Sequence, residues 1–281
     1  MNPWLPTSPC TPPGCARHEG PARGPLPAAV LLFAGCALTL TGALTAPLAL
    51  LLGPAHRERL IRAWAHGVVR AFGVQVRVVG RPDAHRGGPG VLVVANHVSW
   101  LDIPLIAAVC PGRMLAKSDI RHWPVLGALA TLGGTLFVER ERLRALPAAV
   151  HAIASALRGG ARVVVFPEGS TWCGRGPGGR FRPAAFQAAI DAGATVQPVR
   201  VRYLGAPAGH RVPAGAAAFV GDDPLAVSLW RVVRAAGLTA EIVVLPPIPA
   251  GSVRDRRALA RLAQSTVASD SANLPAESVH H

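Results

Sequence analysis

A histidine and an aspartate stand five positions apart in the segment 91–102, VLVVANHVSWLD. The apolar run at 91–95 predicts a buried strand, and after a polar turn a helix is expected to start near Ser99–Asp102. His97 in that turn is then accessible, and the carboxylate of Asp102 lies about one helical turn away. Such a carboxylate fixes the tautomer of the imidazole and stabilises the imidazolium ion, so the pair is suited to taking up a proton.

The same segment also has a purely structural interpretation. Ser99-x-x-Asp102 has the spacing of a capping box, and Asp102 alone is suited to cap a helix that continues through Pro104. Single histidines are common in proteins of any function. Taken alone, the segment leaves catalysis and helix capping both open.

A second turn follows an apolar strand in the segment 163–171, VVVFPEGST. Its proline and glycine shape the turn, and a glycine lets backbone approach a ligand closely. The carboxylate in this turn either hydrogen-bonds a polyol headgroup or holds the turn together. The candidate binding residues are Glu168, Gly169, Ser170 and Thr171.

An arginine ends a further predicted strand in the segment 133–140, GGTLFVER. The planar guanidinium of Arg140 is suited to phosphate because it donates two parallel hydrogen bonds and keeps its charge. The structural alternative is a solvated arginine within the charged run RERLR.

Strands and helices alternate around these turns. Short β-branched runs occur at 74–79, 91–95, 135–138, 162–166, 196–202 and 241–245, and stretches with helical spacing at 101–110, 143–158 and 184–192. This alternation predicts a single α/β domain over 54–250, with a central mixed sheet flanked by helices. Over 251–281 we expect a basic helix near 254–264 and a frayed end from Ser265.

The N-terminal part has a different composition. Residues 1–25 are rich in Pro and Gly without periodicity and predict a disordered leader. The segment 26–53 contains no charged residue, and its Pro-free run at 28–46 would span about 28 Å as a helix. It is expected to cross a membrane or, kinked at Pro47, to dip into one leaflet. A buried core helix and a signal peptide are the alternatives.

Basic residues follow this apolar segment more often than they precede it. Four arginines come after it, at positions 57, 59, 62 and 70, against two before it, at 17 and 23. The positive-inside rule therefore places the following domain on the cytoplasmic face of the cell membrane. Residues 55–72 put Leu60, Trp64, Val68 and Phe72 on one face of a helix, which suits either the lipid headgroup layer or a protein core.

Composition sets limits on function. The chain has 281 residues, of which 50% are hydrophobic and 16% charged, so it is not disordered as a whole. Its net charge of +14, from 29 basic and 15 acidic residues, indicates an anionic partner. The five cysteines are an odd number without a CxxC pair and indicate neither a disulfide framework nor a metal site.

In combination, the motifs resemble those of the glycerolipid acyltransferases of the lysophosphatidic acid acyltransferase type. NHVSWLD is similar to the family's NHxxxxD block, GGTLFVER to its second block, FPEGST to its FPEGT block and VQPV at 196–199 to its fourth. The region MLAKSDIRHWPVLGAL, which contains Lys117, is similar to the segment that links the first two blocks. The resemblance covers about 85–245.

The resemblance implies an enzyme that moves a fatty acyl group from a thioester, acyl-CoA or acyl carrier protein, to a lysophospholipid hydroxyl. It implies that His97 is the general base and that Asp102 orients it. It further implies that Arg140 binds an acceptor phosphate, that Glu168 and Gly169 shape the acceptor site, and that Ser170, Thr171 and Lys117 also bind substrate. The reaction is expected to need no cofactor and no metal, and to take place at a bilayer without nucleic acid.

One residue departs from the pattern. Family members that form phosphatidic acid commonly carry Arg directly after the Thr of the third block, where this chain has Trp172. Acylation of 1-acylglycerol 3-phosphate to phosphatidic acid is the first expectation, and acylation of another lysolipid, such as a lyso-ornithine lipid, is the alternative.

Two other classes of function agree less well with the sequence. A serine hydrolase could combine His97 and Asp102 with a serine, but the chain has no GxSxG motif. A non-catalytic basic module that binds membranes or nucleic acid would explain the charge but not the NHxxxxD block.

Overall fold

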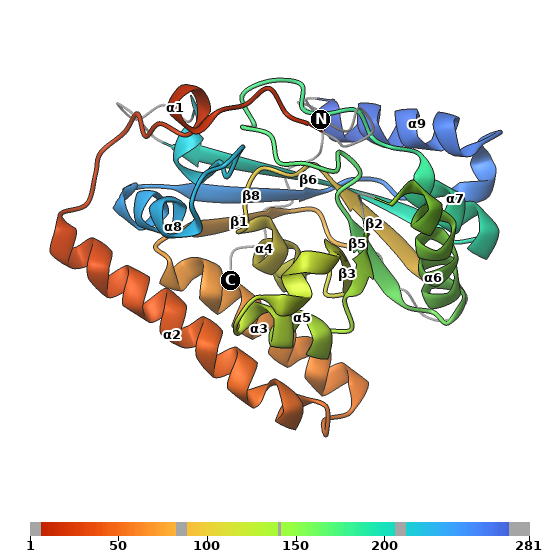
Figure 1. Ribbon diagram of the computed structural model, residues 1–281, viewed down its shortest axis with the longest axis horizontal. Helices are drawn as coiled ribbons and strands as arrows, with labels where there is room; N and C mark the ends of the chain where they lie inside the picture. Colours follow the sequence, from red (N-terminus) through yellow and green to blue (C-terminus); the bar gives the residue numbers. More distant parts are fainter. Residues whose placement is uncertain (1–6, 83–88, 140–141, 206–211, 270–281) are drawn as a thin grey trace.

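The computed structural model describes residues 7–82, 89–139, 142–205 and 212–269 (Figure 1). A mixed sheet forms the middle layer, as the alternating pattern predicted, in the order β1-β8-β6-β2-β5-β3-β4, with β7 and β9 paired to β6. Its strands are β1 (Gln75–Val79), β2 (Val91–Ala95), β3 (Arg113–Lys117), β4 (Leu136–Val138), β5 (Arg162–Val165), β6 (Thr195–Gly205), β7 (Val212–Pro213), β8 (Thr239–Val244) and β9 (Ile248–Pro249).

Five neighbouring strands run in the same direction. β6, β2, β5, β3 and β4 pair in parallel, whereas β8 runs antiparallel to β6. The carboxyl ends of the five parallel strands therefore share one edge of the sheet. His97 and Glu168 lie in the segments that follow β2 and β5, and Lys117 is the last residue of β3.

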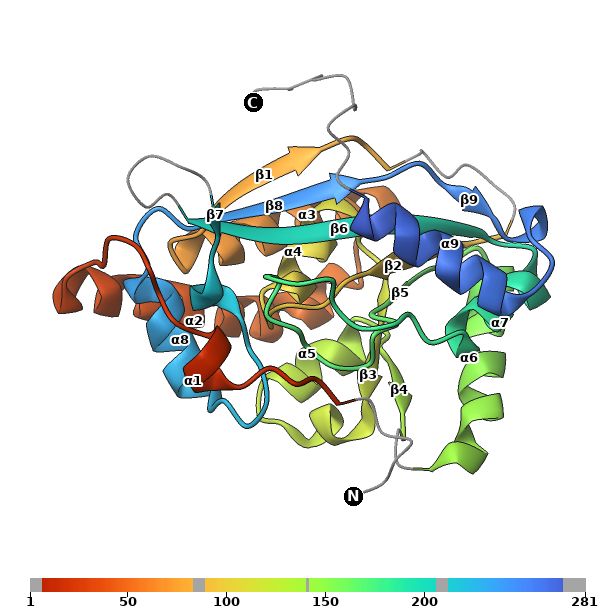
Figure 2. The ribbon, with the colours of Figure 1, turned by 90° about the horizontal axis from the view of Figure 1, so that it is seen from above.

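Helices cover both faces of the sheet (Figures 1 and 2). Residues of β2 alternate between two hydrophobic clusters, because successive side chains of a strand point to opposite faces: Val93 and Ala95 join one cluster, Leu92 and Val94 the other. The first cluster is covered by α3 (Pro54–Ala71), α4 (Asp102–Val109) and α8 (Leu225–Arg234), and the second by α6 (Leu146–Arg158), α7 (Ala184–Ala192) and α9 (Arg256–Ala268). Two shorter helices are α1 (Pro12–Cys15) and α5 (Leu126–Leu132).

The apolar N-terminal segment forms one helix, α2 (Pro25–Ala49), which starts at a proline because the first turn does not use that backbone N–H. Pro47 lies in its last turn, so the helix continues through 28–46. By length and composition α2 could cross a membrane, and only 17% of its most apolar window is buried. It packs on α3, where Gly35 faces the Phe72 ring, Gly42 faces Trp64, and Trp64 Nε1 donates to Leu38 O at 3.0 Å.

Most of the apolar stripe of α3 faces protein. Val68 and Phe72 are buried in the first cluster and Trp64 packs against α2, whereas Leu60, nearer the start of the helix, is exposed. Of the two interpretations of residues 55–72, the structure therefore supports packing on a core for the second half of the helix.

The structure differs from the predicted disordered leader over residues 7–25. Ala22 forms a β-bridge with Ala235, and the Arg23 guanidinium donates to the carbonyls of Val233, Ala235 and Gly73. A proline-rich segment without periodicity can be ordered in this way, because its backbone groups pair with the domain instead of with each other. At the other end, α9 continues past Ser265 to Ala268, and Asp255 caps its start by accepting from two backbone N–H groups.

Candidate active site

The turn after β2 is fixed to the neighbouring strand by Asn96. Its Nδ2 donates to Val201 O at 2.9 Å, and its Oδ1 accepts from Val201 N at 2.8 Å. These two bonds continue the pairing of β2 with β6 beyond Ala95, where β2 and its backbone hydrogen bonds end. The next residue, His97, therefore starts from a defined position at the carboxyl edge of the sheet.

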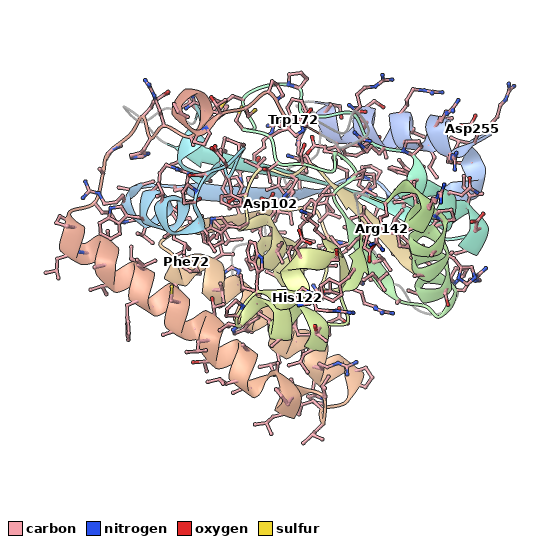
Figure 3. All side chains as sticks on the ribbon, in the orientation of Figure 1. Phe72, Asp102, His122, Arg142, Trp172 and Asp255 are labelled. Atoms are coloured by element: carbon pink, nitrogen blue, oxygen red, sulfur yellow. The ribbon has the colours of Figure 1, made fainter. Side chains whose placement is uncertain are left out.

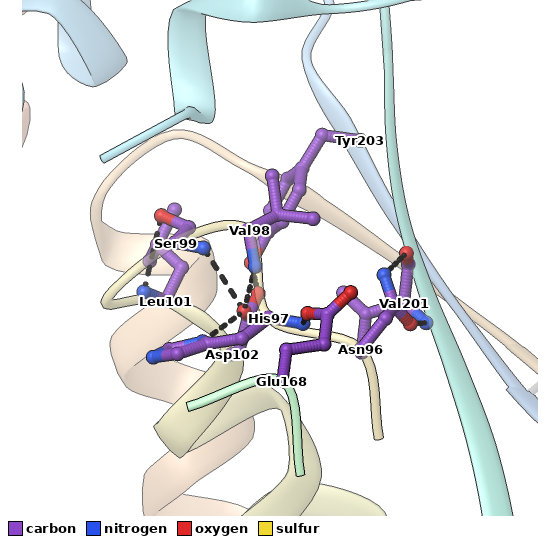
Figure 4. A network of polar contacts seen from close by, with 9 residues as sticks. All are labelled: Asn96, His97, Val98, Ser99, Leu101, Asp102, Glu168, Val201 and Tyr203. Atoms are coloured by element: carbon purple, nitrogen blue, oxygen red, sulfur yellow. Dashed lines mark hydrogen bonds and ion pairs between the residues drawn. The ribbon is translucent and has the colours of Figure 1, made fainter. Parts of the chain in front are cut away.

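His97 and Asp102 are in contact (Figure 4). His97 Nδ1 lies 2.8 Å from Asp102 Oδ2. The side chain of His97 is 20% exposed, whereas that of Asp102 is fully buried. When Nδ1 carries the proton and donates to this carboxylate, Nε2 is left as the basic nitrogen. The geometry is that of a partly accessible base with a buried carboxylate behind it.

Asp102 has three further donors. Its Oδ2 accepts from the backbone N–H groups of Val98 at 2.7 Å and Ser99 at 2.9 Å, and its Oδ1 accepts from the Tyr203 hydroxyl at 2.7 Å. The Ser99 hydroxyl accepts from Leu101 N at 3.3 Å, so the reciprocal capping box is not formed. Asp102 therefore stabilises the start of α4 and contacts the imidazole at the same time, which means that the two interpretations of this segment are compatible.

The plane of the imidazole is set by Phe166, from the turn after β5. The two rings are stacked with centroids 4.0 Å apart and an interplanar angle of 15°. Because one face of His97 is covered and Nδ1 is hydrogen-bonded, little rotational freedom remains for the ring.

Glu168 holds the backbone around His97. Its Oε2 accepts from His97 N at 2.7 Å and its Oε1 accepts from Gly179 N at 2.9 Å. Burial raises the pKa of Glu168 to about 7, although these two N–H donors act in the opposite direction and the nearby Asp102 adds to the rise. Of the two roles considered for this carboxylate, the contacts support the one in which it holds the turn together.

The loop that follows Glu168 also contacts the turn of His97. Trp172 N donates to His97 O at 2.8 Å, so the backbone N–H of His97 is bonded to Glu168 and its carbonyl to the loop. Gly178 has φ +73°, and a Cβ built on it would lie 2.5 Å from Glu168 Oε1. Only a glycine fits where the loop passes so close to the carboxylate. Figure 3 labels Asp102, the first residue of α4, and Trp172 on this loop.

The remaining predicted binding residues come from different parts of the structure. Ser170 and Thr171 are half-buried beside Glu168, and the Ser170 hydroxyl is buried with no hydrogen-bond partner among the described residues. Gly169 has φ +75°. Lys117 ends β3, and its Nζ lies 2.5 Å from Asp119 Oδ2. Arg140 lies outside the described residues.

Sequence reasoning did not assign Tyr203, Phe166, Asn96 or Trp172 a part in positioning His97. Asn96 opens the first block, and Phe166 and Trp172 lie within or next to the third, so their position was a usable signal. Tyr203 had none, because it lies on β6, and only the pairing of β6 with β2 brings it to Asp102.

Comparison with known proteins is consistent with this geometry. The family model described as Acyltransferase matches residues 75–202. The lyso-ornithine lipid O-acyltransferase of Pseudomonas aeruginosa is 38% identical over 215 residues, which are 75% of this chain and 78% of the relative. The 1-acyl-sn-glycerol-3-phosphate acyltransferase of Neisseria gonorrhoeae is 39% identical over 208 residues, 73% of this chain and 78% of the relative.

A solved structure shares the fold. The crystal structure of the 1-acyl-sn-glycerophosphate acyltransferase from Thermotoga maritima superimposes with a TM-score of 0.63 over 86% of this chain and 92% of that one, at 20% sequence identity.

Proposed function

This chain belongs to the acyltransferase family, and on that premise we propose that it transfers a fatty acyl group from an acyl thioester to the free hydroxyl of a lysolipid. The observation that carries the proposal is the contact between His97 Nδ1 and the buried Asp102, which leaves Nε2 of a partly exposed ring as the base. The thioester is acyl-CoA or acyl carrier protein.

In the proposed reaction His97 acts twice. Nε2 first removes the proton from the lysolipid hydroxyl as its oxygen attacks the thioester carbonyl, and Asp102 stabilises the imidazolium that forms. The tetrahedral intermediate then collapses, the carbon–sulfur bond breaks, and the departing thiolate takes the proton from His97. An ester and a free thiol are the products, and neither a covalent acyl-enzyme nor a cofactor is involved.

The first acceptor we propose is 1-acylglycerol 3-phosphate, which would give phosphatidic acid. The similarity to the Neisseria gonorrhoeae enzyme supports it. We propose that Ser170, whose buried hydroxyl has no hydrogen-bond partner among the described residues, binds the acceptor together with Thr171, Gly169 and Lys117. Arg140 is proposed as the ligand of the acceptor phosphate.

The second acceptor we propose is a lyso-ornithine lipid. Trp172 stands where phosphatidate-forming relatives commonly carry an arginine, which removes one phosphate ligand. The similarity to the Pseudomonas aeruginosa enzyme supports this alternative.

We also propose that α2 holds the enzyme on the cytoplasmic face of the membrane. One face of α2 packs on α3, and the opposite face exposes Leu26, Val30, Phe33, Leu40, Leu44 and Leu48, which we call the α2 stripe. These positions are three, four or seven residues apart, so they lie on one side of the helix and form one apolar surface. A helix packed along the domain in this way favours insertion into one leaflet over a full span.

Replacing His97 by Ala tests the mechanism. We expect acyl transfer to be lost in the His97→Ala variant while its circular dichroism spectrum is unchanged, because the imidazole supplies the only base in the proposed steps. The exposed His151 on α6 provides a control, since His151→Ala should keep wild-type activity. An active His97→Ala enzyme would refute the mechanism.

A panel of lysolipids distinguishes the acceptors. Purified enzyme is given one labelled acyl-CoA and either 1-acylglycerol 3-phosphate, lyso-ornithine lipid or lysophosphatidylcholine, and kcat/KM is compared. A preference for the phosphate monoester of at least ten-fold supports the first acceptor, and the reverse preference supports the second. Comparable rates on all three would contradict both assignments.

A further inference from the structure

Three of the five cysteines meet in space although their sequence spacing indicates no site. The Sγ atoms of Cys10, Cys15 and Cys173 all lie within 4.8 Å of one another. Cys10 precedes the short helix α1, Cys15 is the last residue of α1, and Cys173 lies on the loop that follows Glu168. In the part of the chain that the structure describes, Cys36 on α2 and Cys110 at the end of α4 are not members of this cluster.

We propose that Cys10, Cys15 and Cys173 bind one thiophilic metal cation, of the zinc or copper(I) class, which ties the N-terminal segment to the loop beside the candidate active site. The site is independent of the proposed acyl transfer, because none of the three thiols takes part in the reaction described above.

The spacing of the sulfur atoms suits a shared cation. Bonds of about 2.3 Å between a metal and thiolate sulfur place three sulfur atoms about 4 Å apart around one ion. The cluster therefore needs an adjustment of less than about 1 Å. A disulfide would bring two sulfurs to about 2 Å and leave the third cysteine without a role. Soft thiolate ligands select zinc and copper(I) over harder cations.

The cluster is shielded from water. Cys10 is buried, and Cys15 and Cys173 are half-buried. Water therefore competes little with a bound metal, least of all at Cys10.

The two segments that carry the cysteines are fixed to each other by other contacts. Glu19 Oε1 lies 3.1 Å from Arg175 Nη2, which joins the N-terminal segment to the loop. Gly215 lies so close that a Cβ built on it would be 2.4 Å from Cys15 O. The three sulfurs are therefore brought together by packing on both sides of the cluster.

Binding would act on the candidate active site through one residue. Cys173 directly follows Trp172, whose backbone N–H bonds His97 O. A cation held by Cys173 and the two N-terminal cysteines would restrain this loop. Each thiol that becomes a ligand releases its proton to solvent, so no oxidant or reductant takes part.

Thiol protection tests the site in the unmodified protein. The reduced full-length chain is treated with iodoacetamide, with and without one equivalent of Zn²⁺, and the alkylated cysteines are mapped by mass spectrometry. We expect Zn²⁺ to slow alkylation of Cys10, Cys15 and Cys173 at least ten-fold and to leave the exposed Cys36 unaffected. Equal effects on Cys36 and on the three clustered cysteines would overturn the proposal.

Substitutions supply the second test. Zn²⁺ affinity is measured by competition with a chromogenic chelator, and Cu⁺ is tested in the same way under anaerobic conditions. Loss of a residue that only supports a metal ligand weakens binding about 10- to 100-fold, and loss of a ligand should weaken it at least as much. Cys15→Ser and Cys173→Ser should therefore bind Zn²⁺ far more weakly than Cys36→Ser. Unchanged affinity in both would refute the site. An intramolecular disulfide in freshly purified protein, seen as two missing free thiols, would also overturn it.

Discussion

Four hydrogen bonds converge on the buried carboxylate of Asp102, and only one of them comes from the imidazole that it is proposed to orient. Two come from the turn itself and fix Oδ2 relative to the chain. The fourth, from the Tyr203 hydroxyl, is the only one that a distant strand supplies. Tyr203 is therefore a positioning residue, which acts on His97 through Asp102.

Removing this hydroxyl should affect turnover more than substrate affinity. A hydrogen bond to a charged group contributes about 1.5–3 kcal/mol, so Tyr203→Phe should lower kcat about ten-fold or more, shift its pH profile and leave KM nearly unchanged. Trp100→Phe is the control, since it removes a bond to Ser228 without touching Asp102. A merely structural role would lower stability and leave the pH profile of the remaining activity in place.

Two glycines of one loop provide a matched pair. Gly178 has φ +73° and lies against Glu168 Oε1, whereas a Cβ on Gly176 would meet nothing within 4 Å. Gly178→Ala should therefore lower the free energy of unfolding by about 1–3 kcal/mol and reduce activity. Gly176→Ala should change stability by less than about 0.5 kcal/mol. Denaturant titration and initial rates measure both, and equal effects would contradict the close packing of Gly178.

The raised pKa of Glu168 has a consequence for stability. This carboxyl titrates near 4.5 ordinarily and near 7 in the folded protein, so between these pH values the folded state binds more protons than the unfolded state. Its stabilising contribution is complete below about pH 4.5 and is lost as the pH rises to about 7. The free energy of unfolding should fall over this window by at most about 1.4 kcal/mol per pH unit.

Glu168→Gln supplies the comparison for that pH dependence, because glutamine does not titrate. Denaturant unfolding at several pH values between 4.5 and 7 should give a flatter profile for the variant. Parallel profiles for the two proteins would show that another group is responsible.

The two main catalytic candidates could be predicted because they lie in one segment, where a strand, a turn and a helix start fix their separation. Their partners could not. The contact of Tyr203 with Asp102 depends on the order of strands in the sheet, and a stacked ring such as Phe166 on His97 depends on the pairing of β2 with β5. Neither is encoded in local spacing.

At the scale of secondary-structure elements, α2 has two different faces. Small residues, Gly35 and Gly42, let one face approach Phe72 and Trp64 of α3, and the α2 stripe lies on the other. Replacing the exposed Phe33 by Glu should weaken binding to phospholipid vesicles about ten-fold or more, since a buried phenylalanine contributes about 1.5–3 kcal/mol.

Leu262→Glu on α9 is the control for this change, because Leu262 is exposed on a different helix. Vesicle sedimentation measures both variants. Equal vesicle binding by the Phe33→Glu variant and the wild type would contradict the proposed role of the stripe.

Most strands and helices of the domain were predicted from their apolar runs, but β3, α5 and α8 were not. The order of the N-terminal leader was not predicted either, because it comes from pairing with Gly73, Val233 and Ala235, which lie far away in the sequence.

For the molecule as a whole, the sequence predicted an α/β domain with a mixed central sheet, but not the order of its strands. That order brings the carboxyl ends of β2 and β5 together and so joins the first and third motif blocks. The cysteine cluster could not be predicted for a similar reason. The number and spacing of cysteines describe neighbours along the chain, whereas Cys10 and Cys173 meet only after the leader has folded against the domain.

The α2 stripe determines which lysolipid concentration governs the rate of acyl transfer. An enzyme held in one leaflet encounters lysolipid by lateral diffusion, so the relevant quantity is the number of acceptor molecules per unit of surface area. Adding inert phospholipid at constant total lysolipid should then slow the reaction, even though nothing in the surrounding water has been diluted.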